Sequence, residues 1–224
     1  MSKGKLIVIE GGDSSGKATQ SALLTQKLES NGHLVAHIDF PRYHDNYIGA
    51  LIRECLDGKH GDFINADPRL ASVLYAADRR ESLPQIKTWL EEGRIVVLDR
   101  YTSASLLHQG AKIDTQEKRR EVLQWIYRLE HEVMNLPKPD LLLYLDVPAP
   151  VRLQLLKEQN RELDVAEEST PHQVAVDMAA VDMLTIYKNS KTITCMQEDM
   201  LLPPEVIAEE IFSHIKPLLD NNSN

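Results

Sequence analysis

The feature that most constrains this chain is a glycine-rich turn between a short apolar run and an amphipathic segment. Residues 6–9 (Leu-Ile-Val-Ile) precede Gly11, the turn closes on Gly16-Lys17, and leucines then recur at helical spacing over residues 23–28. This strand–turn–helix arrangement fits the pattern G-x-x-x-x-G-K. In that pattern backbone N–H groups and the positive end of the helix surround a phosphate, and the lysine reaches the β- and γ-phosphates. The pattern predicts a loop that binds the phosphates of a nucleotide.

The last position of the pattern departs from it. Ala18 stands where a serine or threonine would offer Mg²⁺ a hydroxyl ligand, and Thr19 follows one residue late. The alternative is a chance glycine-rich turn, against which the strand before it and the helix after it both argue.

Composition indicates a globular protein with one sizeable core. The 224 residues are 42% hydrophobic and 26% charged, which suits a single domain. A net charge of −9 without a basic stripe argues against nucleic-acid binding. No run of about 18 apolar residues predicts a membrane span, and the N-terminus leaves no room for a signal peptide. Because Cys55 and Cys195 match no metal or redox spacing, we expect a cytoplasmic protein.

Strand-like and helix-like segments alternate along the chain, which predicts a parallel sheet covered on both faces. One of the helices should open at Asp67-Pro68 and bury a stripe of Leu70, Leu74 and Ala77. Since the carboxyl ends of parallel strands share one edge, motifs that follow strands should lie together. Beyond the first strand, we expect strands at residues 35–38, 95–98, 141–145 and 192–196.

Two clusters could hold a phosphate acceptor. Asp39-Phe40-Pro41-Arg42-Tyr43 follows the second predicted strand. Tyr75 and Arg79 lie four apart on a predicted helix, so one ligand could contact both. A ring that stacks on a base and a guanidinium that forks a phosphate would suit a nucleoside monophosphate. The alternative is that Tyr75 and Arg79 merely pack over each other at the surface.

A third cluster follows the strand at 95–98. The Asp99 carboxylate could hold the water shell of a metal, and Arg100 could bridge donor and acceptor phosphates, unless the two form a structural salt bridge. In the polar segment that follows, Ser105, His108 and Gln109 can bond a base edge, although a lone histidine is often structural.

Residues 157–169 are too polar to enter a core. They could form a solvated surface or a mobile cover that brings charge over the phosphates.

With these motifs in order, the chain resembles the thymidylate kinase family, from the first strand to about Glu167 and more loosely beyond. Four motifs carry the resemblance. They are Glu10-Gly-x-Asp-x-x-Gly-Lys17, Phe40-Pro-Arg-Tyr43, Tyr75-x-x-x-Arg79, and Asp99-Arg-Tyr101 running on to His108-Gln109.

The resemblance implies an α/β P-loop NTPase fold, with a five-stranded parallel sheet flanked by helices on both faces. It implies a single domain over residues 1–224 with a short lid at about 157–169. The activity it implies is phosphorylation of dTMP to dTDP with ATP and Mg²⁺, and family members usually form homodimers.

The resemblance also implies site residues. The ATP phosphates would be bound by Gly11, Gly12, Asp13, Ser14, Ser15, Gly16, Lys17, Ala18 and Thr19. The dTMP would be bound by Asp13, Phe40, Arg42, Tyr75, Arg79, Arg100, Tyr101, Ser105, His108 and Gln109. In this arrangement Tyr75 stacks on thymine, Arg79 contacts the carbonyl edge of the base rather than a phosphate, and Arg100 binds the acceptor phosphate.

Lys17, Arg100, Arg161 and Asp13 are the expected catalytic residues, and Asp99 and Asp13 would hold Mg²⁺ partly through water. In the lid, Arg161, Asp164 and Glu167 match family residues. Some members carry an arginine inside the phosphate loop. Here Ser14 and Ser15 fill that stretch, so the arginine should come from the lid, with Arg152 as a second candidate.

Two other functions remain open. One is a kinase for another deoxynucleotide or a deoxynucleoside; the latter would want a carboxylate to accept a sugar hydroxyl proton. The other is a nucleotide-binding regulator without catalysis, which Ala18 motivates.

Overall fold

The computed structural model describes residues 3–158 and 170–220. Its central sheet has the strand order β2-β3-β1-β4-β5, and every neighbouring pair is parallel. The strands are β1 (Lys5–Gly11), β2 (Val35–Asp39), β3 (Ile95–Asp99), β4 (Leu141–Asp146) and β5 (Ser190–Thr194). The predicted five-stranded parallel sheet is thus confirmed, although β5 begins and ends two residues earlier than expected.

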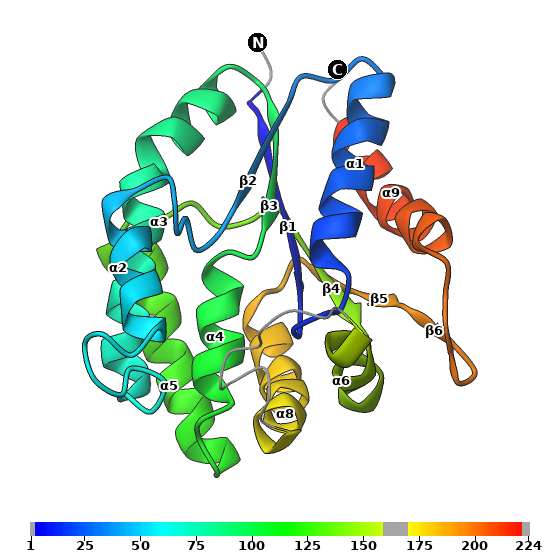
Figure 1. Ribbon diagram of the computed structural model, residues 1–224. Helices are drawn as coiled ribbons and strands as arrows, with labels where there is room; N and C mark the ends of the chain where they lie inside the picture. Colours follow the sequence, from blue (N-terminus) through cyan, green and yellow to red (C-terminus); the bar gives the residue numbers. More distant parts are fainter. Residues whose placement is uncertain (1–2, 159–169, 221–224) are drawn as a thin grey trace.

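Helices cover both faces of the sheet (Figure 1). Alternating residues of β1 separate two cores: Leu6 and Val8 pack toward α3, α4, α5 and α8, whereas Ile7 and Ile9 pack toward α1 and α9. The main helices are α1 (Lys17–Ser30), α2 (Tyr47–Leu56), α3 (Pro68–Glu91), α4 (Thr102–Gly110), α5 (Gln116–Arg128), α6 (Ala149–Glu158), α8 (Thr170–Ile186) and α9 (Pro204–Asp220).

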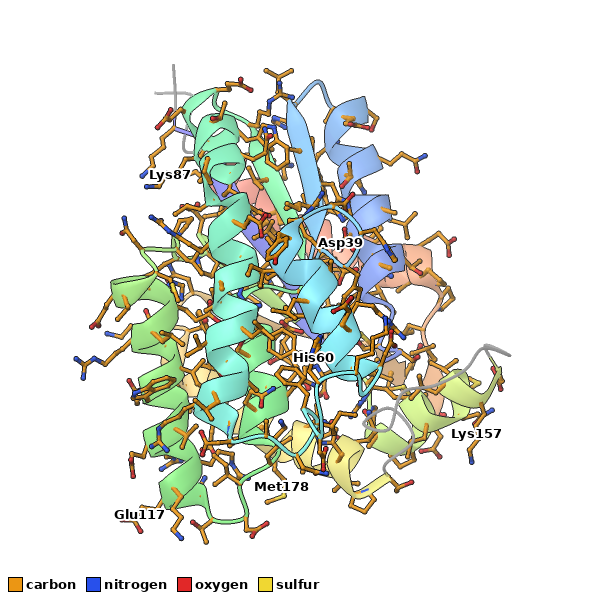
Figure 2. The ribbon with its side chains drawn as sticks, turned by 60° about the vertical axis from the view of Figure 1, so that its left-hand side comes forward. Asp39, His60, Lys87, Glu117, Lys157 and Met178 are labelled. Atoms are coloured by element: carbon orange, nitrogen blue, oxygen red, sulfur yellow. The ribbon has the colours of Figure 1, made fainter. Side chains whose placement is uncertain are left out.

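The long helix α3 begins where the sequence predicts. The Asp67 carboxylate accepts hydrogen bonds from the backbone N–H groups of Arg69 and Leu70, and Pro68 occupies the first turn. Figure 2 shows Lys87 near the far end of this helix.

The predicted buried stripe of α3 is wrong at Leu70, which is 70% exposed, and Leu74 and Ala77 are only half-buried. The buried face carries Ala71, Ala76, Asp78 and Arg79 instead. Apolar periodicity missed this face because two of its members are charged, and their charges are satisfied by hydrogen bonds from other elements. The polar segment after Tyr101 is also helical, as α4.

Two further elements complete the described chain. A π-helical turn, η1 (Leu129–Val133), directly continues α5. A small antiparallel ribbon of β6 (Met196–Gln197) and β7 (Met200–Leu201) precedes α9. Within residues 3–158 and 170–220, no helix is long and apolar enough to cross a membrane.

Candidate active site

The turn between β1 and α1 places Lys17 against the backbone of the loop that it closes. Its Nζ donates to the carbonyl oxygens of Gly11 and Gly12, at 2.9 and 2.7 Å. Gly16 has a φ of 91°, in the left-handed region that glycine adopts without strain. A Cβ on Gly12 would lie 2.2 Å from Nη1 of Arg152, so no larger residue fits there without displacing that guanidinium.

Burial disfavours the charged form of Lys17. The pKa of Lys17 is lowered to about 8, mainly by burial and also by the positive charge of Arg100. The carboxylates of Asp13, Glu10 and Asp99 oppose this shift. Two cations thus share one site at the carboxyl ends of β1 and β3, where anionic ligands bind in open α/β sheets.

Arg100 is fixed by both its backbone and its side chain. Its φ of 62° lies in the left-handed region, which costs a non-glycine residue on the order of 1 kcal/mol or more. Its Nη2 donates to Oδ1 of Asp13 at 2.7 Å, and its Nη1 lies 2.9 Å from Nε2 of His108. Although burial opposes the charged form, Asp13 and Glu10 raise the pKa of Arg100 above its ordinary value. Arg100 is therefore a permanent cation held in one orientation.

Asp13 joins the phosphate loop to α8. Its second oxygen, Oδ2, accepts a hydrogen bond from Nε2 of Gln173 at 3.0 Å. Burial alone would raise the pKa of Asp13, but the positive charges of Arg100 and Lys17 and the hydrogen bond from Gln173 hold that pKa well below the usual range. The carboxylate is therefore ionised, with both of its oxygens already bonded to the protein.

His108 is a neutral partner of Arg100. Burial lowers the pKa of His108 to about 3, so Nε2 can accept from the arginine. Its ring stacks at 6.1 Å on that of His172, near the start of α8. The structure therefore places His108 beside Arg100.

Asp99 ends β3 as a half-buried carboxylate, directly across the ladder from Asp39, which ends β2. Asp39 is labelled in Figure 2. Burial raises the pKa of Asp99, and the charges of Lys17 and Arg100 oppose that rise. Within residues 3–158 and 170–220, the backbone carbonyl of Asp99 accepts from the Phe40 N–H, but the carboxylate oxygens of Asp99 accept no hydrogen bond. No group of three or more His, Cys, Asp or Glu side chains that could hold a metal occurs in the same described part of the chain.

The acceptor side is aromatic. The rings of Phe40 and Tyr101 lie 6.1 Å apart, and that of Tyr75 lies 5.9 Å from Phe63. The bond between Phe40 and Pro41 is cis. Arg42 pairs with Asp45 at 3.1 Å.

Arg79 is buried in an ion pair. Its Nε donates to Oε2 of Glu130 at 3.0 Å, and its Nη2 donates to Oε1 of Glu130 and to the Ser105 hydroxyl. The structure thus joins Arg79 to Ser105, as one cluster beside Tyr101. Gln109 is also buried, and its Oε1 has no hydrogen-bond partner among the described residues.

Two further arginines, Arg161 and Arg152, are the predicted candidates for the catalytic arginine. Arg161, with Asp164 and Glu167, lies outside the described residues. Arg152 is fully buried, and its guanidinium donates to the Val147 carbonyl, to Gln173 and to Asp177. Because these bonds occupy its fork beneath the phosphate loop, Arg152 serves the loop as a support.

Sequence reasoning assigned no role to four polar residues that hold the site in place. Glu10 is fully buried and accepts from the Ser103 hydroxyl and the Gly11 N–H, and burial raises its pKa. Asp78 accepts from the backbone N–H of Arg42 and from Asn46. The other two are Glu130 and Gln173. A carboxylate inside an otherwise apolar segment was the available signal for Glu10, whereas the others depend on contacts distant in sequence.

Comparisons with known proteins point to one family. A model of the thymidylate kinase family matches residues 9–204. The thymidylate kinase of Mycobacterium tuberculosis is 32% identical over 144 residues, which cover 64% of this chain and 66% of that one. Human thymidylate kinase is 34% identical over 145 residues, which cover 65% and 62%. The chain thus matches just under two thirds of the length of these relatives.

A solved structure supports the fold. The thymidylate kinase of Candida albicans superposes with a TM-score of 0.76 at 23% identity, covering 99% of this chain and 94% of that one. Since the family model spans most of the sequence, this chain belongs to the thymidylate kinase family.

Proposed function

We propose that this protein phosphorylates dTMP to dTDP with ATP as the phosphate donor. The observation that carries the proposal is the convergence of Lys17 and Arg100, which follow neighbouring parallel strands, β1 and β3. Their mutual repulsion is costly in a buried site and is offset when phosphate oxygens lie between them. Such a pair suits transfer between a donor and an acceptor that both carry phosphate.

The chemistry requires mainly positioning and charge stabilisation. Lys17 and the loop amides, over residues 11–19, would hold the donor phosphates. Arg100 would hold the acceptor phosphate, oriented by Asp13 and His108. Arg161 remains the proposed lid arginine.

The family implies Mg²⁺, and the donor set is compatible with it. Asp99 supplies a half-buried carboxylate whose oxygens no described residue hydrogen-bonds, which suits a hard cation or its bound water. Both oxygens of Asp13 are already bonded, so Asp99 is the better candidate of the two. When bound, the ion would neutralise charge on the phosphates.

On the acceptor side, Tyr75 would stack on thymine, and Phe40 and Tyr101 would flank the nucleotide. Arg79 would face the carbonyl edge of the base, with Ser105 beside it. Arg42 and Gln109 complete the proposed dTMP residues.

One exposed apolar face and the two cysteines support three wider proposals. We propose that residues 1–224 act as one kinase domain and pair as a homodimer through α3 and α5. Leu70, Val73 and Trp125 leave an exposed apolar face there, and Arg69 connects the two helices by lying over the Trp125 ring.

We also propose a cytoplasmic location. The two cysteines of the chain are both buried free thiols, which agrees with a reducing compartment.

Product analysis tests the activity. Incubation with ATP, Mg²⁺ and dTMP, followed by anion-exchange chromatography, should yield dTDP and ADP in equal amounts. ADP without dTDP would indicate an ATPase. Tight nucleotide binding with no product would favour the non-catalytic regulator that Ala18 suggests.

A further inference from the structure

Glu130 is a fully buried carboxylate that faces the proposed base site from outside every motif. It lies 51 residues from Arg79 along the chain, yet the two form a bidentate ion pair. Glu130 is 0% exposed and Arg79 2% exposed, so the pair is removed from water. Burial raises the pKa of Glu130, while Arg79 and the Ser105 hydroxyl stabilise its ionised form.

A local irregularity brings Glu130 to this position. At η1 the Met134 N–H donates to the Leu129 carbonyl, five residues earlier, at 2.8 Å. Leu129, Glu130 and His131 are consecutive and all buried, so the π-turn holds the Glu130 carboxylate inside the protein between two other buried residues. π-Turns of this kind occur frequently at functional sites.

The ion pair leaves one part of the arginine available. Nε and Nη2 of Arg79 are bonded to Glu130 and Ser105, whereas Nη1 has no hydrogen-bond partner among residues 3–158 and 170–220. Close to this cluster, the Tyr101 hydroxyl is buried and also lacks a partner in the described part of the chain. The site therefore presents an oriented N–H donor that a ligand acceptor would satisfy.

We propose that Glu130 is a positioning residue that makes the acceptor site select pyrimidines with a 4-keto group over those with a 4-amino group. This rests on the proposed function. A guanidinium fixed by a carboxylate presents donors only, so it favours the carbonyl of thymine or uracil and opposes the N–H groups of cytosine. Without that carboxylate, the guanidinium could turn away from the base, and the discrimination against cytosine would weaken.

A second buried ion pair gives a matched control. Asp182 is 0% exposed and accepts from Arg119, Arg120 and Gln116, fastening α5 to α8. It resembles the Glu130 pair in burial and charge, but among the described residues its carboxylate forms no hydrogen bond or ion pair with a proposed site residue. A purely structural role for Glu130 would make Glu130→Gln and Asp182→Asn behave alike.

The test measures kcat/KM for dTMP, dUMP and dCMP in both variants, with the melting temperature of each. Glu130→Gln should raise KM for dTMP about tenfold with a smaller change in kcat, and should reduce the dTMP-to-dCMP ratio about tenfold. The dTMP-to-dUMP ratio should stay unchanged, because those bases share the 4-keto group. Asp182→Asn should lower the melting temperature but leave the dTMP-to-dCMP and dTMP-to-dUMP ratios unchanged. If dCMP is not turned over, its inhibition constant against dTMP gives the ratio.

The outcomes separate the two proposals. No turnover of dTMP by the unaltered protein overturns the proposed function. Normal turnover with an unchanged dTMP-to-dCMP ratio in Glu130→Gln overturns the role of Glu130 alone. If Glu130→Gln does not fold, Ser105→Ala provides a second test, because it removes the hydroxyl shared by Arg79 and Glu130. This variant should reduce the dTMP-to-dCMP ratio about threefold. An unchanged ratio in that variant contradicts the proposal.

Discussion

The Arg100 guanidinium donates to the Asp13 carboxylate across 2.7 Å, which ties the end of β3 to the phosphate loop after β1. Gln173 on α8 donates to the other oxygen of the same carboxylate. One side chain thus sets the distance between the proposed donor and acceptor phosphate sites.

Replacing that carboxylate should affect the acceptor first. In Asp13→Asn, Arg100 loses a charge-assisted bond, which is worth about 1.5–3 kcal/mol. We expect kcat/KM for dTMP to fall by roughly 10- to 100-fold, while KM for ATP changes less than about threefold. Glu209→Gln, which removes a surface pair with Lys27, is the control and should change neither constant. Equal losses for dTMP and ATP would contradict an orienting role for Asp13.

The pH dependence should report Lys17. Because its pKa is lowered from 10.5 to about 8, the cation is present below pH 8 and is lost as the pH rises through that value. We expect kcat/KM for ATP to decline above pH 8, by about tenfold per unit. Lys17→Arg keeps its charge, so its profile should stay level to pH 10 even if its activity is lower. A level profile in the unaltered protein would show that Lys17 is not the titrating group.

The contact beneath the loop makes Gly12 sensitive. A Cβ at Gly12 would approach the buried Arg152 guanidinium to 2.2 Å. Gly12→Ala should therefore cost about 1–3 kcal/mol of unfolding free energy and weaken ATP binding. Gly58→Ala, at a φ of 77° with open space around the new Cβ, should cost stability alone. Urea denaturation and ATP titration check both variants, and unchanged ATP affinity in Gly12→Ala would contradict the support role of Arg152.

Ala18 offers a gain-of-function test. It is exposed at the start of α1, so Ala18→Ser adds a hydroxyl at little cost to packing. We expect the Mg²⁺ concentration for half-maximal activity to fall several-fold, since Mg²⁺ prefers hard oxygen ligands. Thr19→Ala is the matched control and should leave that concentration unchanged. A rise for Thr19→Ala with no change for Ala18→Ser would assign the hydroxyl ligand to Thr19.

The fold could be predicted because its signals are local. Short apolar strands alternating with helices define a parallel sheet, and β1 through α1 follow the phosphate-loop pattern almost residue by residue. The sequence of α4 shows no helical periodicity, because this helix is buried on most sides and lacks one apolar stripe. Periodicity places Leu70 inside because it cannot show that Arg79 occupies the buried face of the same helix.

The site could be predicted most directly where its residues follow strands or the helices that continue them. Lys17, Asp13, Arg100 and His108 do converge, as motif positions at one sheet edge suggest. Gln173 contacts Asp13 from 160 residues away. The contacts of Gln173 and Glu130 depend on how the helices pack against one another. The contacts of Glu130 also depend on a π-turn, which no local sequence pattern predicts.

The most direct test of the central account is the acceptor preference of the reaction. ADP release is measured in a coupled assay with ATP and Mg²⁺, offering dTMP, dUMP, dCMP, dGMP and thymidine separately. Because we propose that Lys17 and Arg100 bind the donor and acceptor phosphates, we predict turnover with dTMP above the other acceptors and none with thymidine. Turnover of thymidine equal to that of dTMP, or no turnover with any acceptor despite tight nucleotide binding, would contradict the account.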